Sequence, residues 1–443
     1  MREYSIQGMK LMFDYMGNKD FNKYSMVTWL GLPVRFVYNN HTFNFDLEGR
    51  IHSINGDSQN SWPNSWDWLQ RTPSNEWLYY SYPGTNSFET YKLTGDHFHA
   101  INTWSNPQNR HGFLTASYVK KAFKEFDVLI EKIRDSLKRD SPVHNWPKQY
   151  QFQSEEASER DSKRVKEFLK KAAEKDKTYL EKDGKRLHKI LGGNMPILPP
   201  DTIHVDYRVI PVLIMDGCGY GCDFCMFHGK KPFRIRNEDN IQAQIQSLRE
   251  FYGEDLRNFN SVVLGQNNGI AAEKDKINLA ARLAYEQFGI ENSYFYGSNL
   301  FIFSTNQTFL GSDDSLFSML EVLPYSNIYI NIGWEAIRDD CLESLGKPHR
   351  SHEVIEGMRR ASEINKRNGR LRISGNFIIG ENLPENHPYS IADAIQSTEF
   401  CGRIYLSPLQ KHSNYYQIRE DLKAVKSSAS KDLSVLLYTM QRL

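Results

Sequence analysis

The stretch that decides the fold is "DYRVIPVLIMDGCGYGCDFCMFHG", residues 206–229. It opens with an apolar run that is typical of a buried parallel strand. The run ends in a loop with three cysteines inside eight residues, Cys218, Cys222 and Cys225. Two glycines lie between the first two cysteines and relax the backbone there. The sequence therefore predicts a buried strand followed at once by a compact thiol loop.

The same alternation of a short apolar strand and a helix recurs downstream. The later strands read "NSVVLG", "NLFIFST", "NIYINIG", "LRISGNFIIG" and "GRIYLSPL", and helical patterns follow the first four of these at 271–288, 313–322, 338–367 and 388–398. Six such strands predict an α/β fold with a parallel sheet, closed or partly closed into a barrel. Chemistry in such barrels takes place at the carboxyl ends of the strands, the edge where the cysteine loop lies.

The chemistry of the loop follows from its thiols. Three clustered cysteines out of five in the chain do not form a disulfide framework. Thiolates are soft ligands that favour iron–sulfur clusters or zinc. A [4Fe–4S] cluster on three cysteines keeps one iron open to an exogenous ligand. Zinc would need His228 as its fourth ligand, all within eleven residues, whereas structural zinc usually joins two separated pairs.

The spacing of the loop closely resembles the CxxxCxxC motif of the radical S-adenosylmethionine (SAM) superfamily, with Phe224 as the aromatic residue before the last cysteine. The resemblance covers roughly residues 205–410. It implies a partial (β/α)6 TIM-like barrel, a [4Fe–4S] cluster held by Cys218, Cys222 and Cys225, and SAM as the ligand of the open iron. It also implies reductive cleavage of SAM to a 5′-deoxyadenosyl radical that abstracts hydrogen from a substrate.

Further residues are assigned to SAM by a similarity of the barrel region to the oxygen-independent coproporphyrinogen oxidase and methylthiotransferase branch. This similarity implies that Glu335 and Asn376 contact the ribose and that Lys347 contacts the carboxylate. Polar side chains also follow the second and third strands: Gln266, Asn267, Ser304 and Asn306. Amides there can accept from the SAM ammonium, although the acidic residue usual in the family is missing. A structural role in the strand–helix turns is the alternative for these four residues.

The other cysteines and the histidines have simpler interpretations. Cys341 lies in a helical pattern and is expected to fill the core. Cys401 opens the sixth strand and is a weak candidate for a hydrogen donor. Two cysteines are too few for a second cluster, and no cobalamin-type segment is present. His97 and His99 share one face if they lie on a strand, with His111 nearby, but packed or solvated histidines are the simpler interpretation.

Outside the barrel the chain divides into three further parts. Residues 1–117 carry six of the eight tryptophans and several β-rich runs, which indicates a β-rich aromatic domain. Residues 118–204 show a charged helical pattern and are interpreted as a connector. The barrel is expected over 205–410, and 411–443 are expected to form a helical tail.

Composition restricts the surroundings of the protein. The 443 residues carry a net charge of +1, which gives no global field for nucleic acid or an anionic membrane. No run approaches 18 uncharged apolar residues, so no membrane span is expected. The N-terminus lacks a secretory signal pattern, and the cysteine usage favours a reducing, cytoplasmic location.

The sequence leaves the substrate open between classes. The first hypothesis is an enzyme acting on a small molecule or biosynthetic intermediate, with an electron donor such as flavodoxin or ferredoxin. The second is a modifier of tRNA or of a peptide recruited by the N-terminal domain. The third is a zinc-stabilised binding protein without catalysis.

Overall fold

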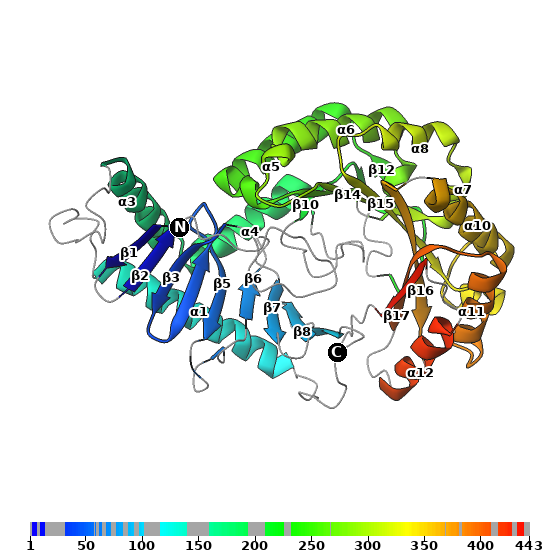
Figure 1. Ribbon diagram of the computed structural model, residues 1–443, viewed down its shortest axis with the longest axis horizontal. Coiled ribbons are helices and arrows are strands. Elements are labelled where there is room, and N and C mark those ends of the chain that lie inside the picture. The colour runs from blue at the N-terminus through cyan, green and yellow to red at the C-terminus, as the bar shows by residue number, and fades with distance from the viewer. Residues whose placement is uncertain are drawn as a thin grey trace.

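The protein is described by a computed structural model (Figure 1). The described residues are 2–6, 9–13, 32–56, 58, 62–63, 68–71, 77–82, 87–92, 97–101, 116–139, 159–193, 209–225, 232–265, 267–367, 369–380, 383–408, 415–427 and 432–437.

The N-terminal part forms a single antiparallel sheet of nine strands in which every strand pairs with its neighbour along the chain. The strands are β1 (Arg2–Ile6), β2 (Met9–Phe13), β3 (Val34–Tyr38), β4 (His41–Phe45), β5 (Ile51–Gly56), β6 (Trp68–Arg71), β7 (Trp77–Tyr82), β8 (Ser87–Lys92) and β9 (His97–Ile101). Asn39 and Asn40 adopt positive φ in the two-residue turn between β3 and β4, as expected for a tight hairpin. The predicted β-rich domain is therefore a meander.

Three helices complete this N-terminal part: α1 (Ala116–Arg139), α3 (Glu159–Glu174) and α4 (Lys177–Leu191). These helices pack on the sheet, since Phe126 of α1 and Phe168 of α3 share one buried cluster with Phe36 and Phe45 of the strands. The interpretation of 118–204 as a solvated connector differs from this arrangement. Its charged pattern describes only the outward face of the helices, while the inward face covers one side of the sheet.

The C-terminal part is built on a parallel sheet whose strands follow in chain order. The strands are β10 (Val209–Val212), β13 (Ser261–Leu264), β14 (Asn299–Thr305), β15 (Asn327–Glu335), β16 (Leu371–Ile379), β17 (Gly402–Pro408) and β18 (Leu433–Leu437). Between β10 and β13, β11 (Met215–Asp216) and β12 (Arg234–Ile235) form a small antiparallel pair. All six predicted strands are present and parallel, which confirms the partial barrel.

Helices cover the outer, convex side of this curved sheet (Figure 1). They are α5 (Glu238–Tyr252), η4 (Gly253–Asn258), η5 (Gly269–Ala271), α6 (Lys274–Gln287), η6 (Ile290–Asn292), α7 (Asn306–Gly311), α8 (Asp314–Glu321), α9 (Asp339–Ser344), α10 (Ser351–Arg367), α11 (His387–Ser397) and α12 (Tyr415–Lys426). Helix α5 shows why the local sequence forms a helix. Asn237 caps it by accepting from the Asn240 amide, and Glu238 and Asp239 lie in the first turn, where the helix dipole favours acids.

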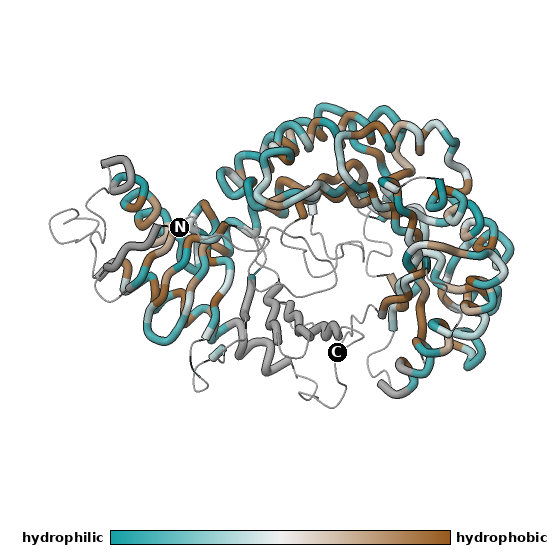
Figure 2. Tube along the Cα trace, viewed as in Figure 1, coloured by the Kyte–Doolittle hydropathy of each residue, from teal (hydrophilic) through white to brown (hydrophobic). Residues whose placement is uncertain are grey.

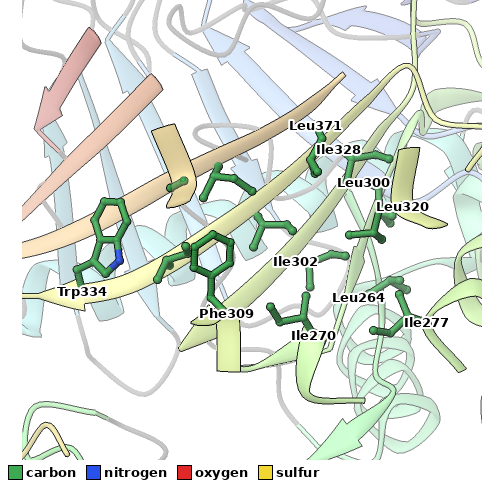
Figure 3. Packing of buried hydrophobic residues seen from close by; sticks show 14 of the residues in the cluster. Leu264, Ile270, Ile277, Leu300, Ile302, Phe309, Leu320, Ile328, Trp334 and Leu371 are labelled. Atoms are coloured by element: carbon green, nitrogen blue, oxygen red, sulfur yellow. The ribbon is translucent and has the colours of Figure 1, made fainter. Parts of the chain in front are cut away.

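The main core lies between the sheet and these helices. Leu300, Ile302 and Ile328 of the strands contact the same cluster as Phe309 and Leu320 of the helices (Figure 3). Figure 2 shows apolar segments along the strands and polar segments along the outer helix surfaces. Because strand side chains alternate, the residues between these core positions point to the inner, concave face of the sheet.

The seventh strand extends the barrel beyond the predicted boundary at residue 410. Strand β18 pairs with β17 in parallel, with Leu433 opposite Gly402, and α12 precedes it. The segment 411–443, interpreted as a helical tail, therefore contributes a strand–helix unit to the sheet. Its strand is only five residues long and gives a weak sequence signal.

A buried charge cluster joins the N-terminal sheet to the barrel. Arg50, after β4, donates to Asp46 at 2.6 Å, to Asp183 of α4 at 3.0 Å and to the Phe251 carbonyl of α5 at 3.2 Å. Burial alone lowers the pKa of Arg50, but the surrounding carboxylates outweigh burial and raise it, so Arg50 stays charged. The cluster fixes three elements from distant parts of the sequence.

Within the described ranges, no helix has the length and apolar character needed to cross a membrane. The five cysteines all lie in these ranges, and none of them forms a disulfide.

Candidate functional site

The cysteine loop starts from an anchored carboxylate at the carboxyl edge of the parallel sheet. Asp216, at the end of β11, lies 2.5 Å from Nη2 of Arg236. The same guanidinium donates to the Leu191 carbonyl at the end of α4 at 2.7 Å. Because Arg236 is buried, this contact joins the start of the loop to the helical part of the chain.

The loop packs against the turn that follows α9. The Asp223 amide donates to the Leu345 carbonyl at 3.3 Å, and the Cys225 amide donates to the Cys222 carbonyl at 3.0 Å. Gly346 is required there, because it has φ +66° and an added Cβ would lie 3.2 Å from the Asp223 nitrogen. Cys222 is buried, and the other two loop cysteines are half-buried. The turn after α9 thus fixes the loop from one side.

An ion pair of Lys347 and Glu335 lies beside the loop. Their charged atoms are 3.1 Å apart, and the two side chains are only 9% and 11% exposed. Lys347 also lies 5.5 Å from the ring centroid of Phe224, so it contacts the loop through its aromatic residue. Glu335 has φ +66° at a bulge that ends β15, a strained conformation of the kind that clusters at functional sites.

The charges of this pair and of the thiols influence one another. Burial alone lowers the pKa of Lys347, yet Glu335, Cys222 and Cys225 outweigh burial and raise it. Burial raises the pKa of the Cys222 thiol, and the Lys347 ammonium opposes that rise. These effects place the four groups within electrostatic reach of one another. A metal bound here would displace the thiol proton, so its affinity would depend on pH.

The donor set of the loop suits an iron–sulfur cubane. Cys218, Cys222 and Cys225 would supply three thiolate ligands to a [4Fe–4S] cluster, and a non-protein ligand would supply the fourth. The described residues include all three loop cysteines, but no three His, Cys, Asp or Glu side chains among them lie together as a metal-binding group. Binding of a cluster would therefore require the loop to bring its thiols closer together. His228, the fourth ligand in the zinc alternative, lies outside the described residues.

Two predicted SAM contacts follow β13, at the carboxyl edge of the sheet. Gln266 is outside the described residues. The Asn267 amide nitrogen is buried and has no hydrogen-bond partner within the described ranges. A buried donor of this kind requires a partner, and a ligand carbonyl or carboxylate would supply one. Asn267 is therefore a candidate ligand-binding residue at the carboxyl end of β13.

Asn376 belongs to the inner face of the sheet at the level of this site. It pairs in register with Gly333, two residues before Glu335. Its amide donates to Asn331 at 2.7 Å, and Asn331 in turn donates to Ser374 at 2.9 Å. Asn376 is half-buried, so its side chain remains accessible from the lumen.

Two predicted SAM contacts face the helix layer instead. Ser304 pairs with the core residue Ile332, is buried, and donates to the neighbouring Thr305 carbonyl at 2.8 Å. Asn306 is fully buried and opens α7. It accepts from the Trp334 indole at 3.0 Å and donates to the Glu353 carbonyl at 2.9 Å. Because their partners lie in the protein, we replace the predicted ligand role of both residues with a structural one.

The remaining candidates lie away from the loop. Cys401 precedes β17, at the edge where the parallel strands begin, opposite the cysteine loop. That placement speaks against its prediction as a hydrogen donor. Cys341 is fully buried in α9 and packs in the core, as expected. His97 and His99 lie on β9, but their side chains and His111 are outside the described features.

Sequence reasoning missed the groups that hold the site in place. Asp216 and Arg236 anchor the loop, and Asn331 orients Asn376. Arg236 is 20 residues from Asp216 in sequence, and no motif links them. The alternation of the strand "NIYINIG" does place Asn331 on the face opposite the isoleucines, a signal that was available.

Comparison with known proteins identifies the domain. Residues 212–395 match the model of the radical SAM superfamily. No curated protein matches the chain. Similar solved structures share only 12–13% identity with it, with TM-scores of 0.32–0.36.

Three of these structures are SuiB from Streptococcus suis, coproporphyrinogen III oxidase (HemN) from Escherichia coli and the methyltransferase TsrM from Kitasatospora setae. The match to SuiB covers 79% of this chain and 69% of SuiB. The matches to HemN and TsrM cover 51% and 45% of this chain, and 48% and 35% of those proteins. This chain therefore spans about a third of the length of TsrM.

The matched region contains the three-cysteine loop, the Lys347–Glu335 pair and strands β13 to β16. The cofactors of the family are a [4Fe–4S] cluster and SAM. The loop, the parallel sheet and this match identify residues 212–395 as a radical SAM domain.

Proposed function

We propose that the chain is a radical SAM enzyme in which Cys218, Cys222 and Cys225 hold a [4Fe–4S] cluster and SAM binds beside it. Its substrate is a small molecule or biosynthetic intermediate from which hydrogen is abstracted in the barrel. The observation that carries the proposal is the position of the three-cysteine loop. It follows the first parallel strand at the carboxyl edge of the sheet and contacts the Lys347–Glu335 pair through Phe224.

When bound, the reduced cluster supplies the electron that splits SAM into methionine and a 5′-deoxyadenosyl radical. The side chains of this protein bind and orient SAM. The Lys347 ammonium suits the SAM carboxylate, and the Glu335 carboxylate accepts from the ribose hydroxyls. The two residues are already paired at 3.1 Å, so each is held in place before the ligand arrives.

Asn267 and Asn376 complete the proposed SAM pocket. The buried amide of Asn267 supplies a donor that lacks a partner among the described residues. Asn376 is oriented by Asn331 and both donates and accepts, which suits a ribose hydroxyl. Gln266 stays a candidate for the ammonium, because its amide oxygen accepts. The buried helix-facing core behind these residues excludes water from one side of the site.

The test is anaerobic reconstitution with iron and sulfide, followed by a reductant and SAM. Production of 5′-deoxyadenosine is expected. Cys222→Ala should lose the cluster iron and the product, whereas Cys401→Ala, on the opposite edge, should keep both. Wild-type iron in Cys222→Ala, or no 5′-deoxyadenosine from the brown wild-type protein, would contradict the proposal.

The same preparation separates the alternatives. A colourless protein that contains zinc and no sulfide would support the non-catalytic zinc-binding hypothesis. Binding of tRNA or a peptide by the N-terminal sheet would move the substrate to the macromolecular class. We infer a flavodoxin or ferredoxin as the physiological reductant and a reducing cytoplasm as the location, since the five cysteines form no disulfide.

A further inference from the structure

Glu335 lies at the centre of a strained turn at the carboxyl end of β15. The Ala336 amide donates to the Trp334 carbonyl at 2.9 Å, which closes a three-residue turn around Glu335. The φ of Glu335 is +66°, and a positive φ at the central residue makes this the rarer, strained form of the γ-turn. A residue other than glycine keeps such a conformation only where the surrounding structure enforces it.

The turn directs the Glu335 carboxylate back over the inner face of the sheet. An added Cβ on Gly333 would lie 2.5 Å from Oε1 of Glu335 and 3.4 Å from Nζ of Lys347. Gly333 pairs in register with Asn376, which lies on the inner face. The ion pair therefore occupies the space that a side chain at position 333 would fill, and the two proposed ribose contacts, Glu335 and Asn376, lie on the same face.

A buried histidine contacts the carbonyl on which this turn closes. His349 is only 3% exposed, and its Nε2 lies 3.2 Å from the Trp334 carbonyl oxygen. Because a carbonyl oxygen only accepts, Nε2 carries the ring hydrogen and donates it. Burial lowers the pKa of His349 and the nearby Lys347 ammonium lowers it further, so the imidazole is neutral. Its one N–H hydrogen is therefore used in holding the turn.

The side chain of Trp334 fixes the same peptide from the helix layer. Its indole donates to Asn306 at 3.0 Å, and its ring centroid lies 5.6 Å from that of Phe377. Trp334 is fully buried in the main core, so its side chain cannot follow a rotation of the backbone. The indole contacts and the His349 bond thus both resist rotation of the peptide that joins Trp334 to Glu335.

The segment that carries His349 also contacts the cysteine loop. Gly346 lies against Asp223 of the loop, and Lys347 lies near Phe224. His349 follows only two residues later. One short segment therefore contacts the loop, the Glu335 carboxylate and the turn, and it sets the position of the carboxylate relative to the loop.

We propose that His349 is a positioning residue for SAM: its hydrogen bond to the Trp334 carbonyl holds the strained turn that directs Glu335 toward the ribose. This inference rests on the function proposed above, because it takes Glu335 as a SAM contact. His349 acts through Glu335 in this role. Support of this kind keeps a binding group in its productive geometry before the ligand arrives.

The first test is the affinity of the full-length, anaerobically reconstituted protein for SAM, measured by calorimetric titration. His349→Leu removes the donor and should weaken SAM binding about tenfold. His349→Gln carries an amide N–H with a similar reach and should restore the affinity to within about threefold of wild type. His387→Leu is the matched control, since His387 is also buried with its Nε2 on a strand carbonyl, that of Ile378 at 2.9 Å. This control should bind SAM within about twofold of wild type.

A double-mutant cycle with Glu335→Ala distinguishes positioning from a general loss of structure. If His349 acts through Glu335, adding His349→Leu to Glu335→Ala should change the SAM affinity by less than about twofold. Circular dichroism of each variant verifies that it is folded. The proposal is overturned if His349→Leu binds SAM like wild type, if the two losses add in full, or if His387→Leu loses affinity equally.

Hydrogen exchange of the apo chain separates this inference from the proposed function. A peptide spanning 333–338 contains the Ala336 amide, whose bond closes the turn. It should exchange about tenfold faster in His349→Leu and at the wild-type rate in His349→Gln and His387→Leu. If the wild-type protein binds no SAM, the proposed function fails, yet faster exchange in His349→Leu alone would still establish that His349 holds the turn. Unchanged exchange in His349→Leu would overturn that role as well.

Discussion

The Lys347–Glu335 pair permits a quantitative test of the site in the absence of any cofactor. Glu335→Gln keeps the shape of the side chain and removes its charge, so the buried Lys347 ammonium loses its counter-charge. Lys347→Met removes the ammonium, keeps the apolar part of the side chain and leaves the Glu335 carboxylate without its counter-charge. The double variant removes both charges and leaves neither stranded. A double-mutant cycle over these variants measures the coupling of the pair.

The magnitude follows from the geometry. At 3.1 Å and an effective dielectric constant of about 20, the two charges attract by about 5 kcal/mol, part of which offsets their desolvation. Removing one partner of a buried pair costs about 3–5 kcal/mol. The side chains are about a tenth exposed, so we expect the lower end, about 3 kcal/mol for each single variant. The double variant leaves no uncompensated buried charge, so it should lose less than either single variant.

The assay is hydrogen exchange of the apo chain, read by mass spectrometry on peptides spanning 327–335 and 371–379. These peptides cover β15 and β16 and report the opening free energy of the sheet around the pair. Glu343→Gln, from the exposed Arg350–Glu343 pair, is the control and should leave this exchange unchanged. If the double variant loses the full sum of the single losses, the two charges are not coupled and the reasoning fails.

Three further outcomes are expected. Asn306→Ala should lower the free energy of unfolding by about 2–4 kcal/mol, because it leaves the buried Trp334 indole without its acceptor. The SAM affinity of the folded variant should stay unchanged. A selective loss of SAM affinity would show that Asn306 is a ligand after all. Arg50→Met should lower the free energy of unfolding, measured in urea, by about 3–5 kcal/mol, because it leaves the buried carboxylates of Asp46 and Asp183 without their cation. A loss below about 1 kcal/mol would show that this charge cluster contributes little to stability. Burial lowers the pKa of His387 below its ordinary 6.5, so at mildly acidic pH the unfolded chain binds a proton at this residue and the folded chain does not. The free energy of unfolding should therefore fall as the pH falls below about 6.5. His387→Gln should reduce this slope and the exposed control His352→Gln should not; equal slopes in both variants would remove His387 as the cause.

The burial of His387 is a feature of the tertiary structure that the local sequence does not predict. Its Nε2 lies 2.9 Å from the Ile378 carbonyl, and its Nδ1 is buried without a partner among the described residues. The residue follows Glu385-Asn386 in a polar segment, which in sequence suggests an exposed loop. Burial in α11 arises from packing against β16, a contact between segments that the local pattern does not specify.

The sequence by itself determined the thiol loop and the parallel sheet. The spacing of Cys218, Cys222 and Cys225 places three thiols within eight residues of one loop, whatever surrounds them. The six apolar strands and their helices follow from local periodicity, which depends only on residues a few positions apart. Those features needed no knowledge of distant contacts, and the structure confirms the six parallel strands.

Only the tertiary structure decided which polar side chains face the loop. Ser304 lies in β14, Asn306 directly follows it, and Asn376 lies in β16. The first two side chains bond within the strand–helix layer, whereas Asn376 lies on the inner face of the sheet. Cys401 was placed at the opposite edge because it starts a strand instead of ending one. The direction of a strand side chain depends on register against neighbouring strands, and one residue of shift reverses it. Register is set by contacts far apart in the chain, and for that reason the local sequence pattern does not contain it.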